Sequence, residues 1–202
     1  MLRCGAGRKS VRSYITQGIR RAAQINPRGI ATICADRRRT WPEVVDRVSR
    51  LAAGLRSLGV EKGDRVAVLS MNTDRYFELY YAIWWAGAVA TPMNMRLAPA
   101  EIDFRLEDSG AKILCLDAEH LPLYRQLGPS RAGLSHVVAM EESAEGFVST
   151  EELIAGNDPA QDAGACGDDL AFIVYTGGST GRSKGVMLSH ENICQNGLAS
   201  LH

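Results

Sequence analysis

The sequence predicts an α/β fold with a mostly parallel sheet and helices on both faces. Short apolar runs recur roughly two dozen residues apart, and helical patterns lie between them. These runs lack the alternation of apolar and polar residues that half-exposed strands show, so we expect strands buried on both faces. Strands that alternate with helices form right-handed crossover units, which make the strands parallel and cover both sides of the sheet.

The composition is that of a folded globular chain, with 46% apolar and 6% aromatic residues among 202. Lys and Arg together number 23, as do Asp and Glu, so the chain lacks the positive charge typical of nucleic-acid-binding proteins. No apolar run approaches the ~20 residues that span a bilayer. The five cysteines are widely spaced without a Cys-x-x-Cys pair, which argues against zinc and favours a reduced, cytoplasmic location.

Residues 1–10 are predicted to be a disordered basic leader. No acidic residue precedes Asp36, and the basic residues before it are Arg3, Arg8, Lys9, Arg12, Arg20, Arg21 and Arg28. An Arg-rich, acid-poor start also suits a mitochondrial targeting segment, so that alternative stays open. From Val11 onward, apolar residues return at helical spacing until Asn26 and Pro27, which predicts the first helix.

A short strand and a strongly marked helix follow. The apolar run Ile30–Cys34 predicts the strand, with a turn at residues 36 and 37. Thr40 then begins a helix, because it stands three residues before Glu43 in a capping box, and Gly59 ends it.

Four further apolar runs predict the strands of the main sheet: Arg65–Ser70, Ala88–Pro92, Lys112–Asp117 and His136–Met140. Helical patterns separate them, at Asn72 to Gly87, Pro99 to Asp108 and, less regularly, His120 to Leu127. Residues 11–140 therefore form a predicted α/β N-terminal subdomain.

Residues 141–169 are predicted to be a surface connector. They are rich in Gly, Ala, Asp and Glu, with one short helix signal of capping-box type at Ser149 to Glu152. Residues 170–202 then begin the next subdomain as a strand, a loop, a second strand and the start of a helix. The buried strand is Leu170–Tyr175, and Ser189 caps the helix.

The connection from Tyr175 to Gly185 reads YTGGSTGRSKG, which combines glycines, hydroxyl residues, an Arg and a Lys with no acid. It is not a Walker P-loop, because Ser183 precedes Lys184 and a glycine follows. It also lacks the spacing of the Rossmann glycine motif.

Three interpretations of this loop remain. Gly177 to Gly181 matches G-x-S-x-G, the nucleophile elbow of α/β-hydrolases, with Ser179 as nucleophile; however, such an elbow runs into a helix and needs a downstream acid, and no Asp follows. A plain hairpin tip is the second, although hairpin loops usually have about two to five residues. The third is a phosphate cradle, in which glycines let backbone N–H groups converge on an anion and Lys184 adds charge.

The longer string YTGGSTGRSKGVMLSHENI resembles the phosphate-binding loop of the adenylate-forming enzymes, which include acyl-CoA synthetases, luciferases and the adenylation domains of peptide synthetases. Their pattern Tyr-Thr-Ser-Gly-Thr-Thr-Gly-x-Pro-Lys-Gly-Val is matched at Tyr175, Thr176, Gly178, Thr180, Gly181, Lys184, Gly185 and Val186. Upstream, RTWPEVVDRVSRLAAGLRSLGVEKGDRVA and YAIWWAGAVATPMNMRLAPAEIDFRLEDSGAKILCLD are similar to the same family. The likeness runs from roughly Val11 to the end and implies the N-terminal portion of that fold, truncated.

The resemblance implies an acyl-CoA synthetase that activates a carboxylic acid, with a fatty acid the expected class, as acyl-AMP and passes the acyl group to coenzyme A. ATP would be held through its β- and γ-phosphates by Thr176, Gly177, Gly178, Ser179, Thr180, Gly181 and Lys184. Mg²⁺ would arrive with ATP, with Thr180 as a candidate ligand.

Members of this family are usually more than twice as long. The resemblance therefore implies that the acyl pocket, the adenine contacts and the C-terminal domain with its catalytic lysine lie outside these 202 residues. We expect no catalytic residue in this chain and no turnover by it alone. A non-catalytic nucleotide-binding fragment stays open as an alternative, as does self-association through exposed apolar surface.

Overall fold

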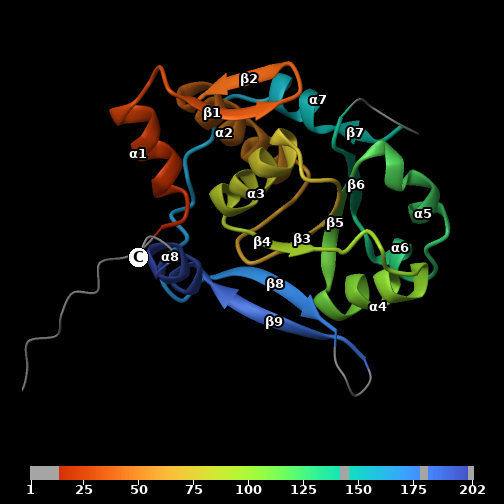
Figure 1. The fold of residues 1–202 in the computed structure, drawn as a ribbon. Helices are drawn as coiled ribbons and strands as arrows, with labels where there is room; N and C mark the ends of the chain where they lie inside the picture. The colour runs from red at the N-terminus through yellow and green to blue at the C-terminus, as the bar shows by residue number, and fades with distance from the viewer. Residues whose placement is uncertain (1–13, 142–145, 178–181, 200–202) are drawn as a thin grey trace, which may run out of the picture.

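The computed structural model describes residues 14–141, 146–177 and 182–199 (Figure 1). Its main sheet has seven strands in the order β7-β6-β5-β3-β4-β8-β9. These strands are β3 (Arg65–Leu69), β4 (Val89–Pro92), β5 (Ala111–Leu116), β6 (His136–Ala139), β7 (Val148–Ser149), β8 (Leu170–Thr176) and β9 (Lys184–Ser189). All neighbouring pairs are parallel except β8 and β9, which are antiparallel, so the predicted fold class is confirmed.

Helices cover both faces of this sheet. They are α1 (Gln17–Ile25), α2 (Trp41–Ser57), α3 (Asp74–Ala86), α4 (Pro99–Ser109), α5 (Leu121–Arg125), α6 (Ser130–Gly133), α7 (Thr150–Ala155) and α8 (His190–Ala199), with a 3₁₀ turn at Ala118–His120. In β3, Val66 and Val68 pack in a core cluster with α2, α3 and α7, whereas Ala67 and Leu69 pack in a second cluster with α4 and α5. Successive residues of a strand point to opposite faces, so the two clusters lie on opposite sides. Within the described ranges, no helix is both long and apolar enough to cross a bilayer.

Local signals set the helix ends. The backbone N–H of Thr40 donates to the carboxylate of Glu43 at 2.7 Å, which confirms the predicted capping box of α2. At α4 the N-cap residue is Ala98, which has no hydroxyl, but its N–H still donates to Glu101 at 3.0 Å. Helix α3 ends at Gly87 with φ of 82°, a conformation that glycine adopts without a Cβ clash.

A two-stranded antiparallel sheet of β1 (Ile30–Cys34) and β2 (Arg37–Thr40) packs beside α2 and α3. The prediction of a turn at residues 36 and 37 was wrong by one position, because Arg37 already begins β2 and the turn centres on Ala35 and Asp36. The run RRRT carries no apolar pattern. What orders it is charge, since Arg37 and Arg39 both pair with the buried carboxylate of Asp74 on α3.

The segment 141–169 contains the short helix that the capping-box signal at Ser149 predicts, and it packs more closely on the core than a surface connector would. It contains β7 and α7, and Leu153 and Ile154 of α7 are buried in the core cluster beside α2. Further along, the indole N–H of Trp85 donates to the carbonyl of Ala160 at 2.9 Å. The backbone N–H of Ala163 in turn donates to the carbonyl of Trp85 at 2.9 Å. The polar composition concealed these contacts, because backbone groups make many of them and leave no apolar pattern in the sequence.

Candidate functional site

The glycine-rich loop leaves the sheet at the carboxyl end of β8. Strand β8 runs parallel to β4, with Phe172 opposite Ala90, and β9 returns antiparallel, with Lys184 opposite Thr176. The end of β8 therefore lies at the same edge of the sheet as the carboxyl ends of β3 and β4. In open α/β sheets, ligands bind outside this edge. Figure 1 shows the hairpin along one side of the molecule, with α4 beside the end of β8.

The described members of the predicted phosphate site, Thr176, Gly177 and Lys184, are all exposed. A Cβ placed on Gly177 would meet no heavy atom of the described residues within 4 Å, so these residues leave the space beside it open. Lys62 and Lys112 form ion pairs with acidic side chains, but Lys184 forms none with any residue that the structure describes.

The other predicted members, Gly178, Ser179, Thr180 and Gly181, lie outside the described residues. Their assignment to phosphate binding stays a prediction. The structure does bring Thr176 and Lys184 together at the base of the loop, although seven residues separate them in the chain.

The α/β-hydrolase alternative is not supported. A nucleophile elbow needs a strand that turns sharply into a helix. Here β8 is followed by β9, and the two strands pair from Thr176 and Lys184 back to Leu170 and Ser189. Ser179 itself lies outside the described residues, but the elements on either side of it have the wrong order for an elbow.

The incoming side of the loop contacts α4, which the sequence did not predict. Tyr175 donates its hydroxyl hydrogen to Oδ2 of Asp108 at 2.7 Å. Its ring meets Phe104 edge-on, with 6.4 Å between centroids, and the guanidinium of Arg105 lies 5.3 Å from the Tyr175 centroid. Burial and the hydrogen bond to Asp108 raise the pKa of Tyr175 well above its ordinary value, so the phenol stays neutral.

The outgoing side of the loop contacts the same helix. The guanidinium of Arg182 lies 5.4 Å from the ring centroid of Phe104. Gly185 pairs with Tyr175 across the two strands, and a Cβ at Gly185 would lie 2.9 Å from Cγ2 of Ile173 and 3.3 Å from Cζ of Tyr175. Glycine at this position therefore leaves room for the tyrosine ring.

His190 begins α8 and is fully buried. Its backbone N–H donates to the carbonyl of Asp169 at 2.9 Å, while neither ring nitrogen has a hydrogen-bond partner among the described residues. Burial lowers the pKa of His190, although nearby Asp169 opposes the shift, and this favours the neutral ring. The placement agrees with a packing role at the start of the helix.

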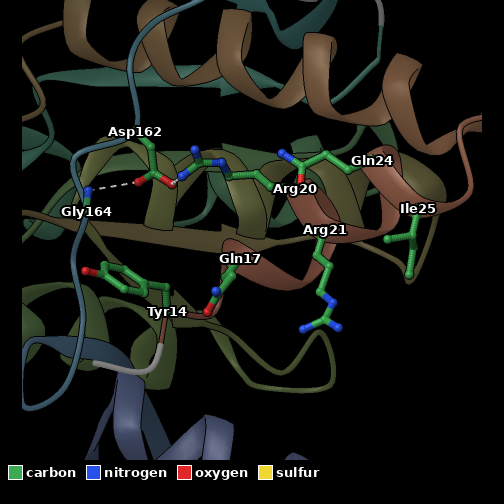
Figure 2. A pocket seen from close by; sticks show the side chains of 8 residues that line it. All are labelled: Tyr14, Gln17, Arg20, Arg21, Gln24, Ile25, Asp162 and Gly164. Carbon is green, nitrogen blue, oxygen red and sulfur yellow. Dashed lines mark hydrogen bonds and ion pairs between the residues drawn. The ribbon is translucent and has the colours of Figure 1, made fainter. Parts of the chain in front are cut away.

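A cavity of about 680 Å³ lies between α1 and the segment before β8 (Figure 2). Asp162 faces it, but both carboxylate oxygens are engaged: Oδ2 accepts from the hydroxyl of Thr16 at 2.7 Å and lies 3.6 Å from Arg20, and Oδ1 accepts from the N–H of Gly164 at 2.9 Å. The lining residues come from α1, its approach and this segment, and none comes from the loop. We assign the cavity no ligand, because Asp162, the one acidic residue among its described lining residues, is engaged in attaching the segment to α1.

Comparisons with known proteins show the family to which this fold and sequence belong. The sequence pattern of the AMP-binding enzymes matches residues 19–201. Feruloyl-CoA synthase of Amycolatopsis sp is 40% identical over 176 residues, which cover 87% of this chain and 33% of that protein. The long-chain-fatty-acid–CoA ligase of Thermus thermophilus is 40% identical over 167 residues, which cover 81% of this chain and 30% of that protein.

The crystal structure of the anthranilate CoA ligase AuaEII in complex with anthranoyl-AMP superimposes with a TM-score of 0.82 and 26% sequence identity, over 87% of this chain and 34% of that chain. The present chain thus spans about a third of the length of these relatives. Because the family pattern matches most of its residues and the fold superimposes as well, the chain belongs to the AMP-binding enzyme family.

Proposed function

We propose that this chain supplies the phosphate-binding loop of an ATP-dependent, AMP-forming acid–CoA ligase. One observation carries the proposal: at the ligand-binding edge of the sheet, Lys184 stands exposed and without an ion pair among the described residues, opposite Thr176. An ammonium and a hydroxyl on the two sides of one loop base suit an anionic ligand that lies between them.

The proposed cradle consists of Thr176, Gly177, Gly178, Ser179, Thr180, Gly181 and Lys184. Its hydroxyl and backbone N–H groups donate to phosphate oxygens, and the ammonium of Lys184 offsets part of their negative charge. The open space beside Gly177 leaves room for the backbone to approach a phosphate closely.

The proposed first step is a nucleotidyl transfer. A carboxylate oxygen attacks the α-phosphorus of ATP and forms acyl-AMP, while the bond from this phosphorus to the α,β-bridging oxygen breaks and pyrophosphate leaves. The sulfur of the coenzyme A thiolate then attacks the acyl carbonyl carbon, and AMP leaves. The loop would hold the β- and γ-phosphates and stabilise the charge that develops on pyrophosphate. The anthranoyl-AMP bound to the relative AuaEII supports an acyl adenylate as the intermediate.

Mg²⁺ is proposed to reach the site with ATP, where it would neutralise phosphate charge. This small, hard cation is commonly held by substrate phosphates together with few protein oxygens. Among the described residues, no three His, Cys, Asp or Glu side chains lie close enough together to hold a metal ion. The proposed protein ligand for Mg²⁺ is the hydroxyl of Thr180.

The proposed acyl substrate is a carboxylic acid, with a fatty acid the class that we favour. Relatives named feruloyl-CoA synthase and long-chain-fatty-acid–CoA ligase support a carboxylic acid, and together they span aromatic and aliphatic acyl groups. A cytoplasmic location stays a prediction from the cysteine pattern.

Equilibrium binding of Mg·ATP by calorimetry tests the cradle. Lys184→Ala should raise the Kd on the order of tenfold, because it removes a charge-assisted contact to phosphate. Lys62→Ala is the matched control: it makes the same change in net charge, but Lys62 precedes β3 at the opposite edge of the sheet and pairs with Asp169. Equal Kd values for Lys184→Ala and the wild type, or no binding at all, would contradict the proposal.

ATP–pyrophosphate exchange with a panel of fatty and aryl acids tests the expected inactivity of the 202-residue chain alone. We expect no exchange, since the chain spans about a third of its relatives. Clear turnover would overturn this expectation. Binding of Mg·ATP without turnover would fit both a ligase portion and a non-catalytic nucleotide-binding fragment, and only acid-dependent exchange by a longer protein with this sequence would favour the ligase.

A further inference from the structure

Helix α4 contacts both ends of the glycine-rich loop. Tyr175 stands immediately before the proposed cradle, and Arg182 stands two residues before Lys184. Both side chains reach α4, through Asp108 and Phe104. Figure 1 shows α4 beside the point where β8 ends. The two chain segments that enter and leave the loop therefore share one support.

The contact between Tyr175, on the incoming side of the loop, and α4 includes a well-formed hydrogen bond. The Tyr175 hydroxyl donates to a carboxylate oxygen of Asp108 at 2.7 Å, and a hydrogen bond to an ionised acceptor is stronger than one between neutral groups. The Tyr175 ring also contacts Phe104, with the two rings edge to face, and the guanidinium of Arg105. The contacts of its ring and its hydroxyl together restrict the side chain of Tyr175, which directly precedes Thr176.

On the outgoing side of the loop, Arg182 contacts the same helix through Phe104. The guanidinium of Arg182 lies over the Phe104 ring at 5.4 Å from its centroid, within the range of a cation–π interaction. Phe104 thus contacts the residue before the cradle and a residue near its end. Gly185 completes the arrangement, because its missing side chain makes space for the Tyr175 ring.

Both elements also have anchors that do not involve these contacts. Helix α4 is already anchored by Ile102 and Leu106, which are buried in the core cluster that includes β3 and β5. Strand β8 is held by its backbone pairing with β4 and β9. What the additional contacts restrict is the base of the loop, where Thr176 and Lys184 project.

We propose that Asp108 and Phe104 of α4 are positioning residues for the phosphate-binding loop, acting through Tyr175 and Arg182. The inference rests on the function proposed above. A loop held in its binding conformation binds more tightly, because the apparent Kd is the intrinsic Kd divided by the fraction of molecules in that conformation. Neither α4 residue needs to touch the nucleotide.

Binding of Mg·ATP and of inorganic tripolyphosphate to the 202-residue chain tests the inference, with Tyr175→Phe, Asp108→Ala and the double variant. Each single change should raise both Kd values about fivefold, the cost of one lost hydrogen bond. The double variant should bind no more weakly than either single one, because both remove the same interaction. Asp108→Asn keeps an acceptor for the tyrosine hydroxyl and should restore most of the affinity.

Tyr124→Phe is the matched control: Tyr124 belongs to α5 and packs against Phe147, away from the loop, so this change should leave both Kd values unchanged. All titrations are run at a temperature where circular dichroism shows every variant fully folded, so a general loss of stability cannot raise the Kd. Amide hydrogen exchange at Thr176 and Lys184 provides a second measurement, and it should be faster in Tyr175→Phe.

The outcomes separate this inference from the proposed function. If the wild type binds and Lys184→Ala weakens binding, but Tyr175→Phe and Asp108→Ala bind like the wild type, only the positioning role fails. If the two single effects add in the double variant, Tyr175 and Asp108 act independently and the inference is also wrong. If the wild type binds neither probe, the phosphate cradle and its positioning residues fail together.

Discussion

The central strand β3 and the hairpin strand β9 belong to one sheet but have very different surroundings. Four of the five residues of β3 are buried, whereas no residue of β9 is. The side chains of Val186 and Met187 are 42% and 69% exposed, respectively. In the sequence, both strands are marked by a short apolar run. The difference follows from position in the sheet: β3 lies between two other strands, whereas β9 is the last strand at one edge.

Trp84 of α3 joins these two regions. It is only 6% exposed, and its indole N–H donates to the carbonyl of Ala171 in β8 at 3.0 Å. Its ring also meets the ring of Phe172 edge-on, with 5.0 Å between centroids. Trp84 therefore attaches the hairpin to the central core, together with the backbone pairing of β8 with β4.

The largest effect is expected where this attachment is cut. Trp84→Ala should lower the free energy of unfolding by about 3–5 kcal/mol, because it leaves a cavity and an unpaired carbonyl at Ala171. Urea unfolding measures the change. Trp84→Phe keeps much of the ring volume and should cost clearly less. A loss below about 1 kcal/mol for Trp84→Ala would show that the hairpin is attached by other contacts.

A second contrast is between two buried acidic side chains of α3, Asp74 and Glu78, which pair with arginines of β2 and α2. Asp74 accepts hydrogen bonds from Arg37 at 2.8 and 3.0 Å and also from Arg39. Burial alone would raise the pKa of Asp74, but the hydrogen bonds from the two guanidinium groups outweigh it and hold the pKa well below its ordinary value. In the neighbouring Glu78, burial prevails and raises the pKa.

Asp74→Asn should lower the free energy of unfolding at pH 7 by about 2–3 kcal/mol, the scale of hydrogen bonds to a charged group. Because the folded-state pKa of Asp74 is depressed, its contribution is complete above its unfolded pKa of about 3.9 and is lost as pH falls further. The gap between wild type and variant should therefore narrow below about pH 4 in urea titrations. Glu78 is present in both proteins, so its opposite effect largely cancels. The exposed Asp36→Asn is the control, and a pH-independent gap for Asp74→Asn would refute the assignment.

The smallest effect is expected on the exposed hairpin. Met187→Ser should change the free energy of unfolding by no more than about 0.5 kcal/mol, because most of this side chain is exposed. Met140→Ser makes the same chemical change at a buried position of the central core, and it should cost several times more. A loss above about 1 kcal/mol for Met187→Ser would show that the hairpin is covered in solution, and light scattering would then test self-association.

Much of the architecture was predictable because its signals are local. Thr40 and Glu43 form their capping box within one turn of helix, and Gly87 ends α3 through its own backbone conformation. The apolar runs of β3 to β6 are set by burial on both faces, which any strand at the centre of such a sheet must satisfy. Strand β2 escaped prediction, because its order comes from pairing Arg37 and Arg39 with an acid on another element.

The sequence by itself determined strands β3 to β6 and β8, the start of α2, the end of α3 and the pattern of the glycine-rich loop, since these depend on neighbouring residues and backbone preferences. Only the tertiary structure decided the strand order, the burial that distinguishes β3 from β9, and the contact between Tyr175 and Asp108. Those two residues are 67 positions apart, and no short-range pattern relates them. They meet because parallel pairing of β8 with β4 brings the end of β8 beside α4, which is a property of the packed chain and not of either segment alone.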